Sequence, residues 1–286
     1  MPELPEVEIV RRGLNQLTLN HTITGGDVLL QRTIAHPFSV VEFIENIKTN
    51  QIKSWHRRGK YLLAELTPAS HLPTSPSLPW LGVHLRMTGQ LLWLNQDEPL
   101  HKHTRVRLFF ENGQELRFVD QRTFGQMWYV PSSVPVETII TGLAKLAVDP
   151  FAPEFTVEYL GNKLERSRRP IKTALLDQSV VAGLGNIYAD EALFKSGILP
   201  TTICAELDQK QIAPLRTAII DVLSASIAAG GTTFSNFLNV KGVNGNYGGE
   251  AWVYNRAGEP CKVCGNVIQK IKLGGRSSHF CDRCQK

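Results

Sequence analysis

Four cysteines near the end of this 286-residue chain form two pairs, Cys261-x-x-Cys264 and Cys281-x-x-Cys284. Two such pairs at this separation have the spacing of a zinc ribbon, in which four thiolates bind one tetrahedral Zn²⁺. Protein ligands fill every position of such a site, so the ion is expected to be structural. A short segment with little apolar content needs this cross-link to hold a β-hairpin. The sequence therefore predicts a C-terminal zinc hairpin.

The cellular compartment decides between zinc and disulfide bonds. No charged-then-apolar leader opens the sequence, and no apolar run is long enough to span a membrane, so we expect a cytoplasmic protein. Thiols stay reduced in that compartment, which favours zinc. Cys204 stands apart and is expected to be a small buried side chain.

The net charge of +5 is unevenly distributed along the chain. Residues 241–286 contain eight Lys or Arg and three Asp or Glu, so they account for the whole excess. A small basic module suggests a polyanionic partner, although a solvated basic surface would give the same pattern. The apolar fraction of 42% is that of a folded protein.

The chain begins Met1-Pro2-Glu3-Leu4-Pro5-Glu6. Removal of Met1 would leave Pro2 as a secondary amine, and an α-amino group titrates near pH ~8. Such an amine can be a nucleophile, with Glu3 and Glu6 available to transfer protons. The same residues also suit a simple helix start, because proline and acids favour a first turn.

The apolar periodicity that follows predicts a helix from Leu4 to about Asn20. Anchoring by this helix would hold Pro2 in place, which a frayed terminus could not do.

Residues 22–130 show the pattern of short strands. Alternating β-rich runs begin at Tyr61, Trp80, Gln90, Thr104, Glu115 and Gln126. Asn112-Gly113 is a hairpin signal between two of them. Regularly spaced antiparallel strands favour a β-sandwich. The Pro- and Ser-rich segment 67–79 is expected to be a mobile surface loop.

The remainder is predominantly helical after a proline-punctuated transition at 131–165. Helices are predicted at 171–179, 186–196 and about 209–229, with a glycine turn at 182–185. The predicted fold is α+β: an N-terminal antiparallel β-sandwich flanked by a helix, a helical domain, and a zinc-ribbon hairpin. The expected domain boundaries are 1–135, 136–250 and 251–286.

Two features of the C-terminal half could bind anions. The glycine turn leads into Asn186 at a helix N-terminus, where free N–H groups and the helix dipole attract negative charge. Arg166, Arg168, Arg169 and Lys172 lie upstream, although a plain helical hairpin would look the same. Between the cysteine pairs, Arg276 has small neighbours and would suit a phosphate clamp.

The β-region contains two further candidate features, a basic stretch and a set of large side chains. Residues 53–60 contain Lys53, Arg57, Arg58 and Lys60 and no acid, and Lys60 opens a strand from which it could project into a cleft. An enzyme that extracts a base from a duplex must fill the vacated space, and Met87, Arg122 and Phe124 have suitable shapes. Each of these could also be an ordinary loop or core residue.

Taken in order, these motifs resemble those of bacterial formamidopyrimidine-DNA glycosylases. The resemblance covers almost the whole chain and rests on residues 2–8, 58–62, 120–125, 171–178, 183–191 and 276–284. It implies a β-sandwich and a helical domain with a helix–two-turn–helix and zinc hairpin, with double-stranded DNA in a basic cleft between them. It also implies a monomer that excises oxidised purines, such as 8-oxoguanine and formamidopyrimidines, and then cleaves the strand at the abasic sugar by β,δ-elimination.

The resemblance assigns roles to individual residues. Pro2 would attack the sugar, Glu3 would protonate the ring oxygen and Glu6 would position the terminus. Lys60 would bind a phosphate and donate a proton, and Arg276 would grip phosphates and assist δ-elimination. The implied DNA contacts are His103, Arg122, Arg168, Lys172, Asn186 and Arg276. Met87, Arg122 and Phe124 would fill the vacated stack, and the loop 242–249 would close over the base.

Two alternatives remain open at this stage. Endonuclease VIII shares the Pro-Glu start, the lysine and the zinc hairpin but prefers oxidised pyrimidines. Its start usually reads Pro-Glu-Gly-Pro, so Leu4 and the motif at 120–125 favour the purine enzyme. A non-catalytic DNA-binding protein on the same scaffold would not need Pro2, Glu3 and Lys60 together.

Overall fold

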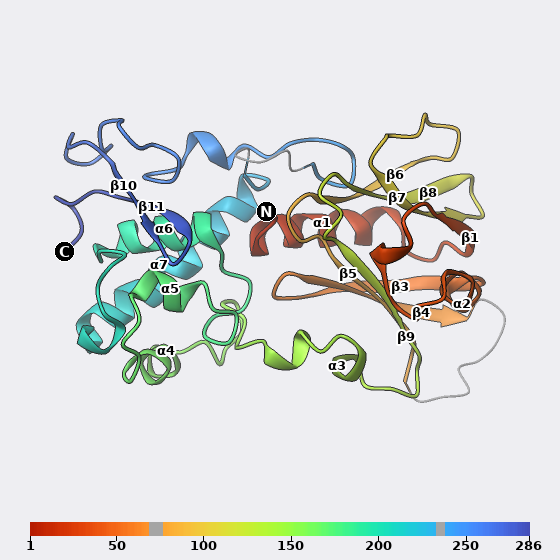
Figure 1. The fold of residues 1–286 in the computed structure, drawn as a ribbon, viewed down its shortest axis with the longest axis horizontal. Helices are drawn as coiled ribbons and strands as arrows, with labels where there is room; N and C mark the ends of the chain where they lie inside the picture. The colour runs from red at the N-terminus through yellow and green to blue at the C-terminus, as the bar shows by residue number, and fades with distance from the viewer. Residues whose placement is uncertain (69–76, 233–237) are drawn as a thin grey trace. The chain divides into compact units, whose positions relative to one another are not determined.

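The computed structural model describes residues 1–68, 77–232 and 238–286. The expected mobile loop at 67–79 falls mainly on residues 69–76, which lie outside the described residues. The described chain forms two compact units (Figure 1), residues 1–144 with 230–245 and residues 145–229 with 246–286. The three-part division of the chain stays a prediction. What the sequence did not suggest is that 230–245 packs with the first unit.

The first unit contains two β-sheets, as the predicted β-sandwich requires. The four-stranded sheet is antiparallel and has the order β1 (Ile23–Val28), β7 (Thr104–Phe110), β8 (Gln114–Asp120), β6 (Gly89–Asn95). The other sheet has the order β2 (Ile34–His36), β9 (Gln126–Val130), β5 (Trp80–His84), β4 (Tyr61–Pro68), β3 (Asn50–Arg58), with only the β2–β9 pair parallel. Gly113, with φ of 75°, lies in the predicted β7–β8 turn. One apolar core draws side chains from both sheets.

Helix α1 (Leu4–Leu17) lies beside β3 and is fixed to it by polar contacts as well as by its buried apolar face. The Asn15 amide donates to the carbonyl of Trp55 at 2.9 Å and accepts from its N–H at 2.8 Å. The Trp55 indole donates to the Thr18 hydroxyl at 2.9 Å. These bonds fix the helix and therefore its N-terminal end.

Segment 230–245 joins the first unit through Val240, which is buried in the core of that unit. Val240 packs on Gly13 of α1, where an added Cβ would lie 3.0 Å from the valine side chain, and its carbonyl accepts from Trp93 N–H at 3.0 Å. The ends of the segment also meet closely, since a Cβ at Gly245 would lie 2.2 Å from the Gly231 carbonyl oxygen. The described residues of this segment, 230–232 and 238–245, are therefore held together at Gly231 and Gly245 and anchored by Val240.

The second unit is helical with a β-hairpin. Helix α5 (Ile171–Leu175) ends earlier than predicted, whereas α6 (Asn186–Ser196) has its predicted bounds and is capped by Gly197 in the left-handed region. The longest helix, α7, has the length and hydropathy of a membrane span, but here it packs on α4 and α6. The elements of this unit are α4 (Val157–Leu164), α5 (Ile171–Leu175), α6 (Asn186–Ser196), α7 (Gln209–Ala228), β10 (Gln269–Leu273) and β11 (Arg276–Phe280).

The shorter elements complete the described chain. Two helices, α2 (Val40–Ile47) and α3 (Val136–Ile139), belong to the first unit. The 3-10 turns are η1 (Gln31–Thr33), η2 (Leu143–Lys145), η3 (Cys204–Glu206) and η4 (Tyr247–Gly249).

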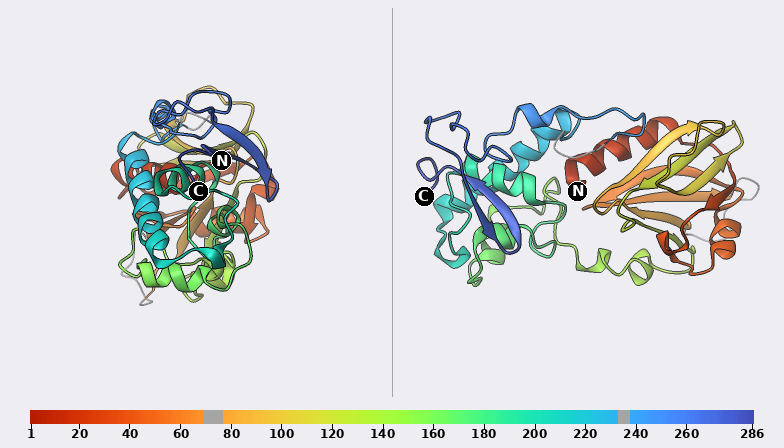
Figure 2. Two further views of the ribbon diagram at one scale, coloured as in Figure 1. Left: turned by 90° about the vertical axis from the view of Figure 1, so that its left-hand side faces the viewer. Right: turned by 45° about the horizontal axis from the view of Figure 1, so that its top comes forward.

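Two neighbouring buried acids on α6 hold the C-terminal segment. Glu191 accepts three successive backbone N–H groups, from Trp252 to Tyr254, at 2.8 to 2.9 Å. Asp190 accepts both the backbone N–H and the ring nitrogen of His279 in β11, at 2.9 and 3.2 Å. The hairpin lies beside α6 in both ribbon views (Figures 1 and 2). Buried carboxylates thus dock the C-terminal segment, because each one accepts backbone N–H groups from it.

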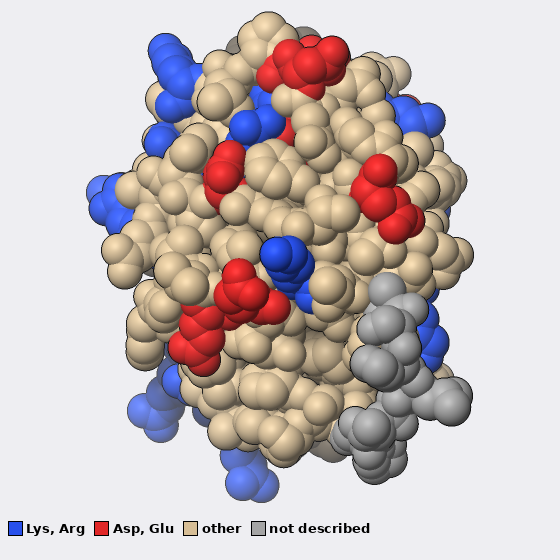
Figure 3. All heavy atoms as spheres, turned by 90° about the vertical axis from the view of Figure 1, so that its right-hand side faces the viewer, with Lys and Arg blue, Asp and Glu red and all other residues tan. Residues whose placement is uncertain are grey.

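One face of the molecule carries acidic and basic side chains in small separate groups (Figure 3). Among the atoms coloured there by charge, no continuous positive area forms. This mixture agrees with the sequence before residue 241, in which basic and acidic residues balance.

Candidate functional site

The chain terminus is held by the carboxylate of Glu6, which is fully buried. One of its oxygens accepts the backbone N–H of Glu3 at 2.8 Å. The other accepts the N–H of Thr232, from the 230–245 loop, at 3.0 Å. Glu6 therefore joins the start of the chain to that loop, and this geometry supports its predicted positioning role.

Charged groups from several elements surround the terminal amine. Burial lowers the pKa of the Met1 α-amino group; the charges of Glu3 and Glu6 oppose this, and those of Lys60 and Arg122 reinforce it. Lys60 itself is 8% exposed and directly precedes β4, after Gly59. A lowered pKa leaves more of an amine neutral and nucleophilic near pH 7. Pro2, the next residue, is also buried.

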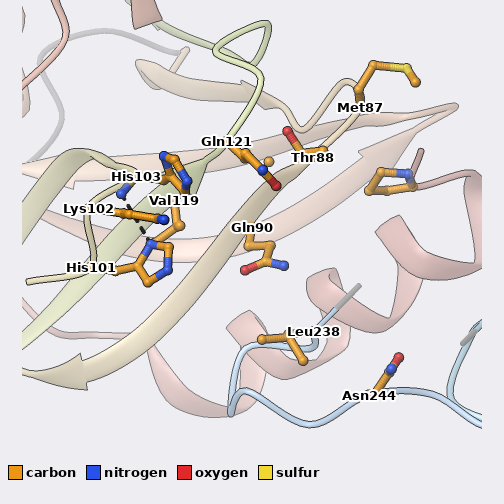
Figure 4. A pocket seen from close by; sticks show the side chains of 12 residues that line it. Met87, Thr88, Gln90, His101, Lys102, His103, Val119, Gln121, Leu238 and Asn244 are labelled. Atoms are coloured by element: carbon orange, nitrogen blue, oxygen red, sulfur yellow. Dashed lines mark hydrogen bonds between the residues drawn. The ribbon is translucent and has the colours of Figure 1, made fainter. Parts of the chain in front are cut away.

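A pocket of about 500 Å³ opens beside Pro2 (Figure 4), within the size range of small-ligand sites. All of the residues around it belong to the first unit. His101, Lys102 and His103 lie together on one side, and Leu238 and Asn244 of the 230–245 loop lie on another. The pocket thus brings together the predicted nucleophile, the predicted DNA contact His103 and the predicted wedge Met87. Its lining residues are Pro2, Met87, Thr88, Gly89, Gln90, His101, Lys102, His103, Val119, Gln121, Leu238 and Asn244.

Asp120 links the turns that carry the three predicted wedge residues. Its buried carboxylate accepts the N–H groups of Arg122 and Gly125, at 3.2 and 2.8 Å, and the hydroxyl of Thr88. Thr88 follows Met87 directly. Phe124 is 53% exposed, with the Arg122 guanidinium 5.0 Å from its ring centre. The turn with the exposed side chains of Arg122 and Phe124 and the turn with Met87 are therefore held by the same carboxylate. Insertion into a duplex would require such a fixed arrangement.

Glu8 connects α1 to the strand that leads to Lys60. It pairs with Arg57 of β3 at 3.1 Å and with Arg11 and Arg12 of its own helix, both at 2.8 Å. Burial alone would raise the pKa of Glu8, but hydrogen bonds from Arg11 and Arg12 and the charges of Arg11 and Arg57 lower it to about 2. The interaction fixes the helix bearing Pro2 relative to the turn bearing Lys60.

The second unit contains the other predicted DNA contacts. Arg168 and Arg276 are exposed, and Arg276 begins β11 after the Gly274-Gly275 turn. Asn186 is the first residue of α6, and its side-chain oxygen is buried without a hydrogen-bond partner among the described residues. The N–H groups at this helix N-terminus can bind an anion, whereas the side-chain oxygen is an acceptor and could bind only a donor.

Lys172 occupies a different environment from the one expected for a DNA contact. It is 1% exposed, and its ammonium lies 2.6 Å from Asp190 and donates to the carbonyl of Ser277 at 2.6 Å. A lysine neutralised inside the unit cannot easily reach a phosphate. The geometry favours a role in holding β11, so direct DNA contact by Lys172 gains no support from it.

The four C-terminal cysteines have the geometry of a tetrahedral zinc site. Their sulfur atoms all lie within 4.8 Å of one another. The separations of Cys261 from Cys284 and of Cys264 from Cys281 are 3.9 and 3.5 Å. Four thiolates at about 2.3 Å from one Zn²⁺ would stand about 3.8 Å apart, so the residues fit the ion. One structural Zn²⁺ therefore belongs to this hairpin.

Several residues of the site were not found from the sequence. Thr232 contributes its backbone N–H, which no side-chain pattern can indicate. No sequence signal indicates the role of Glu8, because acids are common in the first turns of helices. His101 and Lys102, next to His103, were visible as a basic triplet and could have been singled out.

Comparison with known families matches three regions of the chain. Residues 1–127 match the formamidopyrimidine-DNA glycosylase N-terminal domain, and residues 146–237 match the H2TH domain of the same glycosylase. Residues 258–286 match a zinc finger found in FPG and IleRS. Together these regions cover most of the chain.

Similar proteins and solved structures cover the chain fully. Formamidopyrimidine-DNA glycosylases of Nostoc sp. and Trichodesmium erythraeum are 80% and 62% identical, each over 100% of both chains. A structure of a mutant Lactococcus lactis FPG with Fapy-dG containing DNA has 33% identity and a TM-score of 0.89 over 100% of both chains. Another, of FPG from the same organism with an oxidised pyrimidine containing DNA, has 33% identity and a TM-score of 0.88 over 100% of both chains.

Glu8→Gln should destabilise the protein, because Arg57 would lose its buried partner. A carboxylate whose pKa is lowered contributes stability above its ordinary pKa, and that stability is lost as the pH falls toward about 2. We expect a loss of roughly 1–3 kcal/mol at pH 7 that shrinks below about pH 4.5. Urea unfolding of both proteins between pH 7 and pH 3 measures this.

Asp221→Asn, at an exposed pair with Lys195, is the control and should cost under about 1 kcal/mol. A Glu8→Gln loss that is independent of pH would contradict the assignment.

Zinc removal should disorder the hairpin and weaken DNA binding, since the metal is its main cross-link. Amide hydrogen exchange over residues 258–286, with and without a chelator, measures the first effect. Binding to an abasic-analogue duplex measures the second. Cys204→Ser should leave both unchanged, because Cys204 lies outside the cluster. Undiminished protection and affinity after chelation would refute this role for the ion.

Proposed function

The chain belongs to the formamidopyrimidine-DNA glycosylase family, and we propose that its Pro2 nitrogen is the nucleophile of a DNA glycosylase and abasic-site lyase. The protein acts on double-stranded DNA that carries oxidised purines or abasic sites. The residue assignment rests on the groups that surround the chain terminus. Pro2 lines the pocket, and Glu3, Glu6 and Lys60 act electrostatically on the terminal amine beside it. A protein that only bound DNA would need no such arrangement.

The reaction begins once Met1 has been removed. The Pro2 nitrogen attacks C1′ of the damaged nucleotide, the glycosidic bond breaks and the base leaves with its bonding electrons. Glu3 protonates the ring oxygen as the sugar opens. Because the amine is secondary, the product is a cationic iminium, which acidifies the 2′ position. Loss of a 2′ proton expels the 3′ phosphate by β-elimination, and a second elimination then expels the 5′ phosphate.

The other residues hold the DNA for this chemistry. Lys60 binds the phosphate next to the sugar and donates a proton during β-elimination. Arg276 grips the flanking phosphates and assists δ-elimination, while His103, Arg122, Arg168 and Asn186 contact the backbone. Zn²⁺ supplies structural support to the hairpin that carries Arg276. Since the substrate is the bacterial chromosome, we expect the enzyme in the cytoplasm and on the nucleoid.

Met87, Arg122 and Phe124 fill the space left by the flipped nucleotide. Their shared anchor on Asp120 and Thr88 supports this assignment, because a wedge must be rigid when it enters the stack. Leu238 and Asn244 place part of the 230–245 loop at the pocket, which supports closure over the base by residues 242–249. Tyr247, at the end of that region, is buried beside Tyr188.

Borohydride should trap a covalent adduct between the wild-type protein and 8-oxoguanine DNA. Glu3→Gln should slow base release by roughly 10²–10⁴-fold, and Pro2→Gly at least as much, with affinity for an abasic-analogue duplex largely retained. Intact mass spectrometry of the same sample verifies removal of Met1. Absence of an adduct from the wild-type protein would leave DNA binding without catalysis as the better account.

Oxidised pyrimidines are the second candidate substrate, since a relative's structure was solved with such DNA. We expect faster turnover on 8-oxoguanine than on thymine glycol in duplexes that are otherwise identical. Single-turnover rates on the two substrates measure the preference. A clear preference for the glycol would overturn the assignment to purines.

A further inference from the structure

The outward face of the four-stranded sheet holds charges where an exposed surface would be expected. Along β8, Glu115, Arg117 and Val119 alternate with the core residues Leu116 and Phe118. Glu115 is fully buried and Arg117 is 2% exposed. Val119 continues the same row and lines the pocket beside Pro2. One strand face therefore runs from buried charges to the site.

These charges form a triad with the partly buried Arg107 of β7. Glu115 accepts from Arg107 of β7 at 2.7 Å through one oxygen and from Arg117 through the other. Each arginine has further donors besides the one that Glu115 accepts. A buried ion cluster contributes little net stability compared with apolar packing, so its other contacts explain its presence better.

Those contacts are backbone carbonyls of the segment that covers the sheet. Arg117 donates to the carbonyls of Glu98 and Pro99 at 2.9 and 2.8 Å. Arg107 donates to the carbonyl of Gln96 at 3.0 Å. Apolar replacements could fill this space but would break the bonds to these three carbonyls. The triad therefore fixes the path of residues 96–99.

The same segment continues into His101, Lys102 and His103, which we call the basic arm. Its far end is also tied down, because the His101 carbonyl accepts from Thr104 N–H at 2.8 Å and the His103 carbonyl from Asp120 N–H at 2.9 Å. Lys102 is exposed and lines the pocket together with Pro2 (Figure 4). None of the described residues that line this pocket is acidic.

We propose that Lys102 binds a DNA phosphate and that Arg107, Glu115 and Arg117 are positioning residues that hold the basic arm for this contact. The proposal rests on the DNA glycosylase function proposed above. A nucleotide whose sugar reaches Pro2 carries a phosphate on each side, so a cation at the same pocket meets the strand. An ammonium on a fixed backbone loses less freedom on binding than one on a mobile loop. The triad thus sets how well Lys102 binds.

A double-mutant cycle tests this with a duplex containing a tetrahydrofuran abasic analogue. Lys102→Ala should weaken binding by roughly 3- to 10-fold and lower the slope of log affinity against log salt by about one. Arg117→Lys keeps the charge beside Glu115 but loses the two-pronged donation, and it should weaken binding by a similar factor. The double variant should be little weaker than either single one, because both changes remove the same contact.

The control is Asp27→Asn, which removes the half-exposed outer partner of Arg107 and leaves the loop carbonyls bonded. It should bind like the wild-type protein. If Arg117→Lys shows no cooperative unfolding, the paired change Glu115→Leu with Arg117→Met replaces it, since apolar pairs often substitute for buried charges. The paired change should also weaken DNA binding, and adding Lys102→Ala to it should then leave the affinity unchanged.

Additive losses in the cycle, or full affinity when the triad is altered, would overturn the positioning role. Full affinity and an unchanged salt slope in Lys102→Ala would overturn the phosphate contact. Failure of the proposed function looks different, because the wild-type protein itself would then give no borohydride adduct on 8-oxoguanine DNA.

Discussion

The hydrogen bonds of Glu6 are the constraint on which the site depends. Pro2, the proposed nucleophile, would have no covalent restraint on one side once Met1 is removed, so its position must come from other contacts. The Glu6 carboxylate supplies them by binding the backbone of Glu3 and of Thr232 together. Helix α1 then carries this fixed end, and Asn15 and Thr18 hold the helix on Trp55. A mobile terminus is thereby converted into a rigid part of the sheet domain.

Buried carboxylates have the same function elsewhere in the molecule. Asp120 orders the turn with Arg122 and Phe124, and Glu191 orders the start of the C-terminal segment. Each acid accepts backbone N–H groups from a segment without regular structure, and each is almost inaccessible to water. Because a buried donor without a partner is costly, such acids define one conformation of a loop. Loops that must bind a flexible polymer are in this way held as firmly as strands.

Local sequence patterns predicted much of this structure. Helix 186–196, the Asn112-Gly113 turn and the zinc hairpin follow from periodicity and residue spacing within a few turns of chain. Sequence patterns do not predict strands β1 and β3, because glycines in one and charges in the other obscure the alternation. The burial of Lys172 depends on Asp190 and Ser277, which are distant in sequence. Contacts of that kind leave no local signal.

The anchoring of Val240 has a consequence for how the pocket can be opened. Val240 fixes the chain around it to the unit that also contains Pro2. The close approach of Gly245 to Gly231 leaves little freedom where the segment begins and ends. Leu238 and Asn244, which line the pocket, lie on either side of this anchored valine. Opening of the pocket along this side is therefore limited by the packing of the core that also holds helix α1.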